Sequence, residues 1–479
     1  MAHPEPRPLP AEARHLLGLS ADKMRADGAS ASAIRAFLDT LSRTLQGETG
    51  LLPESEVQPV ADLPQLASLP DRPTGDTVLL NQLAVIKLNG GLGTSMGLDR
   101  AKALLPIKGA DTFLDFIARQ MLHLRSHRGV TGLSFYLMNS FTTRTETLAY
   151  LRKYPALTRG EPLDFLQGRV PRLDLETHQP VAWPDQPDLE WCPAGHGDLY
   201  PSLVDSGVLP HLGDQGVRYL FVSNSDNLGA TVDEKLLSYF ARSDLAFLME
   251  VAPRAASDQK GGHLAQRASD GQLLLRESSQ CPAGDLAHFQ DVTRHRFFNT
   301  NNLWIRLDSL KRELERQNGT LPLPIIRNVK PVDPCDPASP KVLQIETAMG
   351  AAIACFARAG AIVVPRSRFS PVKTTADLLA LRSDAYEVTP DFRLALVASR
   401  NGQPPEIELD ERHYGRLADF DACFPAGAPS LAHCDKLKVT GWVVFPAGVR
   451  CRGKVEFANN GPEAKTVQPG DYHNVVVDL

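Results

Sequence analysis

Residues 83–97 read LAVIKLNGGLGTSMG, an apolar run that leads directly into four glycines within eight positions. An unbroken run of Val, Ile and Leu is typical of a strand buried on both faces of a sheet. Glycines let backbone N–H groups approach anionic oxygens closely and adopt positive φ, so a loop of this kind at a strand's end can hold phosphates. The stretch therefore predicts a buried sheet with a phosphate site at its edge.

Similar apolar runs recur along the chain, separated by stretches of helical pattern. They are LSFYLM (133–138), VRYLFVS (217–223), LAFLMEVA (245–252) and AIVVP (361–365). Such alternation predicts an α/β domain over residues 79–400, with a mostly parallel sheet and ligands at the carboxyl ends of its strands.

Two common phosphate-binding patterns do not fit the glycine loop. The Walker pattern GxxxxGK[ST] fails because Gly90, Gly91 and Gly93 are followed five positions later by Ser95, Met96 and Leu98. The Rossmann pattern GxGxxG misses by one residue, and Asp111 opens an apparent helix instead of ending a second strand, where a ribose-binding carboxylate belongs. A dinucleotide-dependent oxidoreductase stays open as a distant alternative.

Charged residues accompany the loop. Lys102 follows it and would bring a point charge to a triphosphate. Asp226, in the NSDN segment after VRYLFVS, is suited to hold Mg²⁺ with one carboxylate while water and phosphates supply the other ligands. The alternative is that NSDN is only a turn.

Four further segments carry polar side chains suited to ligands. His196 lies between two glycines in GHGD, and Asn299 and Asn301 in FNTNNLW suit a hydroxyl-rich ligand unless the segment is an Asn-rich turn. Glu346 lies in QIETAMG at the start of an apparent helix. PRSRFSPVK (365–373) gathers three cations, Lys373 among them, after a strand.

Composition excludes several classes of protein. With 51 basic and 56 acidic residues among 479, the chain has no charge excess that favours nucleic acid or an anionic membrane. No signal-peptide pattern and no run of about 18 apolar residues appears. The seven cysteines form no CxxC pair, which favours reduced thiols, no structural zinc and a cytoplasmic location.

The two ends of the chain follow other periods. Residues 1–78 predict a helical segment, clearest at 30–47, where Ile34, Phe37, Leu38, Leu41 and Leu45 share one face between a serine cap and Gly47. In residues 401–479 two apolar series recur every six residues, which favours a parallel β-helix over an ordinary pair of alternating strands and makes self-association through this domain plausible. The two series are Leu437, Val443, Val449, Val455 and Val439, Phe445, Cys451, Phe457.

Taken together, LNGGLGTSMG, GHGD, VSNSDNLGATVD, FNTNNLW, QIETAMGAAI and PRSRFSPVKTTADLL resemble the eukaryotic-type UTP–glucose-1-phosphate uridylyltransferases over roughly residues 80–390. The resemblance implies a glycosyltransferase-A-like, Rossmann-type mixed sheet core and a C-terminal left-handed β-helix. It also implies Mg²⁺ dependence, UTP and glucose 1-phosphate as substrates, and UDP-glucose as product.

The resemblance also implies roles for single residues. Leu88, Asn89, Gly90 and Gly91 match the family's nucleotide loop, Lys102 and Lys373 its two catalytic lysines, and Gln167 the residue that pairs with uracil. Gly195 is similar to a uridine contact, His196 to a sugar-phosphate contact, Asn224 to a substrate contact, and Asp226 to the metal ligand.

The chain departs from the family pattern beside Lys102. Arg100-Ala101-Lys102-Ala103 stands where the family usually has Gly-Pro-Lys-Ser. The related UDP-N-acetylhexosamine pyrophosphorylases carry an arginine where this chain has Ser95, which favours a hexose 1-phosphate without an acetamido group. Those enzymes, a UDP-sugar pyrophosphorylase of broad specificity and a non-catalytic scaffold remain alternatives.

Overall fold

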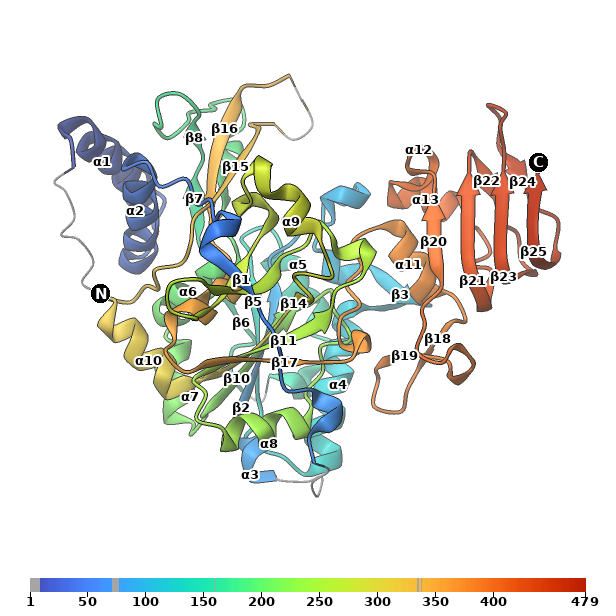
Figure 1. Ribbon diagram of the computed structural model, residues 1–479, viewed down its shortest axis with the longest axis horizontal. Helices are drawn as coiled ribbons and strands as arrows, with labels where there is room; N and C mark the ends of the chain where they lie inside the picture. The colour runs from blue at the N-terminus through green and yellow to red at the C-terminus, as the bar shows by residue number, and fades with distance from the viewer. Residues whose placement is uncertain (1–8, 71–76, 159, 334–335, 337) are drawn as a thin grey trace.

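The computed structural model describes residues 9–70, 77–158, 160–333, 336 and 338–479. A ten-stranded sheet occupies the middle of the molecule (Figure 1). Its path is β1 (Val57–Pro59), β12 (His263–Arg267), β14 (Phe297–Arg306), β10 (Tyr219–Asn224), β2 (Leu83–Asn89), β5 (Ser134–Asn139) and β6 (Asp164–Leu166). Off this path, β13 (Leu273–Arg276) pairs with β12, and β11 (Phe247–Pro253) joins β14 to β17 (Ala359–Val363).

The sheet is mixed, which confirms the mixed sheet core that the family resemblance implies and corrects the mostly parallel sheet expected from the apolar runs. β10, β2, β5 and β6 run in parallel, as do β11 and β17. The long strand β14 runs antiparallel to both β10 and β11 and joins the two parallel groups. β14 contains FNTNNLW, whose amides lack the apolar signature of a buried strand.

Alternate residues of β2 explain why helices cover both faces of the sheet. Leu83 and Val85 pack with α4 (Phe113–Arg128) and α8 (Glu234–Arg242), whereas Ala84 and Ile86 pack with α6 (Leu199–Asp205), α7 (Val208–Asp214) and α10 (Leu307–Arg316). All seven residues of β2 are buried. The apolar run that leads into the glycine loop is thus the centre of a three-layer α/β core.

The N-terminal residues form a helical hairpin, α1 (Ala11–Ala26) and α2 (Ala31–Leu45). Ser30 caps α2 by accepting a hydrogen bond from the N–H of Ala33, and Ile34, Phe37 and Leu41 are buried, as the sequence predicts. The hairpin packs on small sheets beside the core (Figure 1). These are β7 (Arg169–Pro171) with β9 (Trp191–Pro193), and β15 (Ile326–Pro331) with β16 (Lys341–Glu346) and β8 (Leu173–Asp174).

The C-terminal strands lie at one end of the molecule (Figure 1) and pair in parallel. They are β20 (Glu406–Leu409), β21 (Ser430–Thr440), β23 (Val449–Ala458) and β25 (Gly470–Asp478), with β22 (Val443–Val444) on β24 (Lys465–Thr466). Leu437 lies opposite Val455 and Val439 opposite Phe457, three six-residue steps along the chain. All eight positions of the two apolar series are buried.

Shorter elements complete the fold. They are α3 (Thr77–Asn81), β3 (Pro106–Lys108), β4 (Asp111–Thr112), α5 (Arg144–Leu151), α9 (Leu286–Gln290), α11 (Thr375–Arg382), β18 (Tyr386–Val388), β19 (Leu394–Leu396), α12 (Glu411–Tyr414) and α13 (Leu417–Cys423). No helix in the described ranges is long and apolar enough to cross a membrane.

Candidate active site

The glycine loop doubles back on itself beyond the end of β2. Leu92 pairs with Ala101 in an isolated bridge, and the N–H of Lys102 donates to the carbonyl of Gly91 (3.2 Å). Gly97, with φ of 73°, makes the turn in the left-handed region that glycine adopts without strain. The loop thereby returns Lys102 to the end of the strand from which it started.

Lys102 and Asp226 meet at this edge. The Lys102 Nζ lies 2.6 Å from Asp226 Oδ2, and both side chains are partly exposed. Parallel pairing of β10 with β2 places Asn224 opposite Leu88, and the N–H of Ser225 donates to the Leu88 carbonyl (3.0 Å). The NSDN segment therefore lies beside the glycine loop, as the sequence analysis expects.

The side chain of Asn89 faces the protein. It is buried, and its amide donates to Asn139 Oδ1 (2.7 Å) and Thr147 Oγ1 (2.9 Å) and accepts from Ser225 Oγ (3.1 Å). These contacts link β2 to β5, α5 and the segment after β10. In this structure the side chain secures the root of the loop, and its role toward a nucleotide stays a prediction.

Gln167 and Gly195 form a second part of the site. The Gln167 amide donates to the Gly195 carbonyl (2.7 Å), and a Cβ on Gly90 would lie 2.6 Å from Gln167 Oε1. Gly195 has φ of 83°, and a Cβ there would lie 2.6 Å from the Thr347 carbonyl oxygen and 3.0 Å from Glu346 Cβ. At position 195 only glycine permits this approach of the loops, whereas a Cβ at position 90 would displace the end of the Gln167 side chain.

His196 is held in one tautomer. Its Nδ1 accepts a hydrogen bond from the N–H of Met349 (2.9 Å), so the proton of the neutral ring is on Nε2. Burial lowers the pKa of His196 to about 4, so the ring is neutral at pH 7. In the described part of the chain Nε2 has no hydrogen-bond partner, which leaves one N–H donor for a ligand.

Asn299 and Asn301 lie in a bulge of β14, where the register opposite β11 shifts between Glu250 and Val251. Asn301 has φ of 57°, and the two amides bind each other (2.9 Å). The segment for which an Asn-rich turn was the alternative is thus a bulged strand. Glu346 ends β16 and does not start a helix; a short 3-10 segment begins only at Met349. Glu346 lies beside Gly195.

The three cations of PRSRFSPVK are not equivalent. Arg366 pairs with Asp258 (2.6 and 2.8 Å), and the buried Arg368 pairs with the buried Glu250 (2.7 Å twice). Lys373 is exposed, and its Nζ lies 5.8 Å from the Phe298 ring centre. Within the described ranges its ammonium has no ion-pair partner, so the expected cluster of three available cations is reduced to one.

Asn227, which the sequence analysis passed over, joins the Asp226 turn to the Lys373 segment. Its amide donates to the Arg368 carbonyl (3.1 Å) and accepts from the N–H of Ser370 (3.0 Å), and it bridges to Pro371. Arg368 also donates to the Thr231 carbonyl (3.0 Å).

The sequence carries one signal for the buried ion pair of this region. It is Glu250, the charged residue within the apolar run LAFLMEVA.

The residues present fit a magnesium ion that is held mainly by substrate. No cluster of three or more His, Cys, Asp or Glu side chains suited to a metal occurs among the residues that the structure describes. Asp226 offers a carboxylate at the loop edge, and within the described ranges its Oδ1 has no hydrogen-bond partner. Mg²⁺ characteristically uses one or two carboxylates and completes its shell with water and phosphate oxygens.

Comparison with known proteins identifies the family of the chain. A family model described as UTP–glucose-1-phosphate uridylyltransferase matches residues 34–452. The UTP–glucose-1-phosphate uridylyltransferase of Musa acuminata is 40% identical over 88% of this chain and 89% of its own, and that of Saccharomyces cerevisiae is 42% identical over 78% and 74%. A mutant UDP-glucose pyrophosphorylase from Leishmania major, solved in complex with UDP-glucose, is 46% identical with a TM-score of 0.92, covering 98% of this chain and 100% of that one.

Proposed function

The chain belongs to the UTP–glucose-1-phosphate uridylyltransferase family, and from this premise we propose that it makes UDP-glucose and pyrophosphate from UTP and glucose 1-phosphate. The observation that carries the proposal is the contact of Lys102 with Asp226 beside the glycine loop. A cation and a carboxylate at a glycine-rich strand end suit a triphosphate and its metal ion.

In the proposed reaction a phosphate oxygen of glucose 1-phosphate attacks the α-phosphorus of UTP in line, and pyrophosphate leaves. The nucleophile is already an anion, so no general base is needed. The barrier comes from bringing two anions together, and positive charge in the site lowers it. Lys102 and Lys373 supply that charge. Lys102 contacts the Asp226 turn, and Asn227 joins that turn to the segment that carries Lys373.

Asp226 is the proposed metal ligand. When bound, Mg²⁺ would neutralise charge on the phosphate oxygens of the substrates. Asp226 would hold the metal in place of its contact with Lys102, and the Lys102 ammonium would then be available to phosphate. The partial exposure of both side chains is compatible with this exchange.

Gln167 is the proposed uracil ligand. An amide can donate to O4 of uracil and accept from its N3–H, a pairing that cytosine does not return. Leu88, Gly90 and Gly91 would line the nucleotide. The sugar phosphate would contact His196 through its Nε2–H, and Asn224, Asn299, Asn301 and Glu346 would offer amides and a carboxylate to the sugar hydroxyls.

The experiment that tests this function measures pyrophosphate release from UTP with a panel of sugar 1-phosphates, with and without Mg²⁺. Glucose 1-phosphate is expected to be used at least tenfold better than galactose or N-acetylglucosamine 1-phosphate, and only with Mg²⁺. Equal use of glucose and galactose would favour the broad-specificity enzyme. The side chain of Ser95, which favours a sugar without an acetamido group, lies outside the described residues.

Further proposals concern the fold family, the domain boundaries, self-association and the location of the protein. We propose a glycosyltransferase-A-like core, domains at residues 1–78, 79–400 and 401–479, and a left-handed β-helix for the C-terminal strands. Self-association through that domain and a cytoplasmic location are also proposed. The six cysteines within the described ranges are free thiols, which suits a reducing compartment.

A further inference from the structure

The N-terminal hairpin packs directly on the ribbon that carries the proposed uracil site. Met24, Ile34, Phe37 and Leu41 of the hairpin share one apolar cluster with Val170 of β7 and Trp191 of β9. In Figure 1 the hairpin lies beside β7. No step of the proposed reaction uses this hairpin, although it packs on the ribbon next to the proposed uracil ligand.

The β7–β9 ribbon ends at the site. Arg169 pairs with Pro193, so Gln167 precedes one strand by two residues and Gly195 follows the other by two. The bond from the Gln167 amide to the Gly195 carbonyl (2.7 Å) closes this end of the ribbon. A shift of the ribbon would therefore move the Gln167 amide.

Asp27, in the turn between α1 and α2, fixes Arg169. The Arg169 Nε donates to Asp27 Oδ2 (2.7 Å), and a second guanidinium nitrogen binds Oδ1. The guanidinium also packs between the Trp191 ring (4.9 Å) and the Phe141 ring (5.2 Å). A bidentate pair that also stacks on aromatic rings restrains both the position and the plane of the guanidinium.

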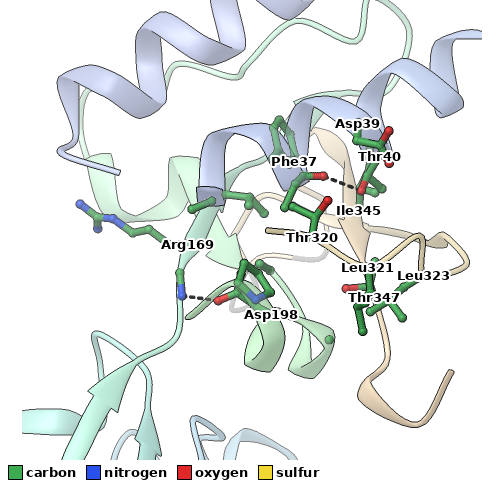
Figure 2. Close-up of a pocket in the computed structure, with 17 residues that line it drawn as sticks. Phe37, Asp39, Thr40, Arg169, Asp198, Thr320, Leu321, Leu323, Ile345 and Thr347 are labelled. Atoms are coloured by element: carbon green, nitrogen blue, oxygen red, sulfur yellow. Dashed lines mark hydrogen bonds between the residues drawn. The ribbon is translucent and has the colours of Figure 1, made fainter. Parts of the chain in front are cut away.

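A second contact holds the same backbone from the opposite side. Asp198 Oδ2 accepts from the N–H of Gly168 (2.6 Å) and from Ser202 Oγ (2.6 Å). Figure 2 shows the pocket between α2 and this ribbon, with Phe37 and Thr40 on its α2 side and Asp198 bonded to the Gly168 backbone. Gly168 and Arg169, the two residues that follow Gln167, are thus held from within the core and from the hairpin.

We propose that the N-terminal hairpin, through Asp27 and Arg169, positions Gln167 for uracil and so sets the affinity and base selectivity for UTP. Asp27 and Arg169 are positioning residues that act through the ribbon and do not touch the substrate. The inference rests on the proposed function because it takes Gln167 as the uracil ligand.

The test compares the full-length wild-type chain with Asp27→Ala and Arg169→Lys. Loss of a bidentate charged pair is expected to raise the Kd for UTP, measured by calorimetry, about tenfold in Asp27→Ala. Arg169→Lys keeps the charge without the fork and is expected to fall between wild type and Asp27→Ala. The ratio of UTP affinity to CTP affinity falls in parallel, while kcat at saturating UTP stays within about twofold of wild type.

Asp22→Ala is the matched control, since it removes the exposed Asp22–Arg25 pair from the same helix. It should change neither Kd nor base selectivity. If Asp27→Ala does not fold, Asp27→Asn gives the same comparison with a smaller perturbation.

Two results would overturn the inference. One is an unchanged Kd for UTP in a folded Asp27→Ala. The other is an equal loss of UTP and CTP affinity together with a lower kcat, as expected from general loosening. Because nucleotide binding is measured without turnover, a wild-type chain that binds UTP but releases no pyrophosphate would refute the proposed function and leave this comparison intact.

Discussion

Three lysines near the carboxyl edge of β2 have different surroundings. Lys87 is buried, its Nζ donates to Ser223 Oγ (2.8 Å) and the Ala230 carbonyl (2.6 Å), and burial lowers its pKa to about 7. Lys102 contacts Asp226, and Lys373 is exposed beside two phenylalanine rings. Lys102 and Lys373 are at least partly exposed and can face a phosphate, whereas the buried Lys87 is engaged with the protein, so Lys102 and Lys373 are the lysines proposed to act.

Replacement of Lys373 by alanine is expected to lower kcat at least about 100-fold, because it removes one of two cations that stabilise the transition state. The unfolding midpoint should stay unchanged, since the side chain is exposed. Initial rates and thermal unfolding measure the two effects. Lys454→Ala, at an exposed lysine of β23, is the control and should be fully active. Turnover near wild type in Lys373→Ala would remove this lysine from the mechanism.

Asp198 predicts a specific pH dependence of stability. Burial raises its pKa to about 6, so the folded state binds a proton that the unfolded state releases near pH 4. Above pH 6 the wild type carries the cost of an ionised buried carboxylate, and this cost disappears as the pH falls toward 4. Asp198→Asn keeps an oxygen acceptor for Gly168 and Ser202 without the charge.

The free energy of unfolding of Asp198→Asn should exceed that of wild type by about 3 kcal/mol at pH 7.5 and by almost nothing at pH 4. Urea unfolding across this range measures the difference. The exposed Asp185→Asn variant should show the same small difference at every pH. An advantage of Asp198→Asn that grows toward low pH would contradict the proposed cause.

At the scale of elements, two turns far apart in the sequence behave as one unit. The Asp226 turn and the Lys373 segment share the contacts of Asn227, and the Arg368–Glu250 pair anchors both to β11. Asn302 and Trp304 of β14 donate to the same Glu250 carboxylate (3.1 and 2.9 Å). The antiparallel strand that the sequence analysis missed therefore supports both turns, which carry the proposed metal ligand and the proposed second lysine.

Removal of one partner of this buried pair should destabilise the protein strongly. Arg368→Met leaves the Glu250 carboxylate buried without its counter-charge, and we expect a loss of about 3–5 kcal/mol in the free energy of unfolding. The double variant with Glu250→Gln should recover much of it. Arg366→Met, at the pair of the partly exposed Arg366 with the buried Asp258, should cost less than Arg368→Met, because solvent reaches Arg366 and Asp258 also accepts from the N–H of Ala255 (2.9 Å). Equal losses in Arg366→Met and Arg368→Met, measured by urea unfolding, would contradict the account.

Sequence patterns within a short stretch predicted the buried strands and the capped helix of the N-terminal hairpin. Apolar runs located β2, β5, β10, β11 and β17, and the cap and stripe located α2. β14 was missed because four of its residues are Asn or Thr, and their burial is possible only because neighbouring loops and strands satisfy them. The strand ending at Glu346 was missed because QIETAMG was interpreted as the start of a helix, whereas it pairs with β15, the preceding strand of the chain, and with the short and distant β8.

At the scale of the whole molecule, apolar residues recur with a different spacing in the hairpin, in the central sheet and in the C-terminal strands. The three parts can therefore be told apart in the sequence. The six-residue period predicted which C-terminal side chains are buried. The period does not predict contacts between distant segments. The contacts of Asp27 with Arg169 and of Asn227 with Arg368 depend on the order of the strands in the sheets. Lys102 and Asp226 were expected at one edge, but their direct contact required the loop to fold back.

The central claim is that uridylyl transfer takes place at the edge formed by the glycine loop and the Asp226 turn. The most direct test measures UDP-glucose and pyrophosphate formed from UTP and glucose 1-phosphate over a series of Mg²⁺ concentrations, in wild type and in Asp226→Asn. The account predicts equal amounts of both products from wild type, a rate that saturates with Mg²⁺, and loss of that Mg²⁺-dependent rate in the variant. No uridylyl transfer by wild type, or the same Mg²⁺ titration in both proteins, would contradict it.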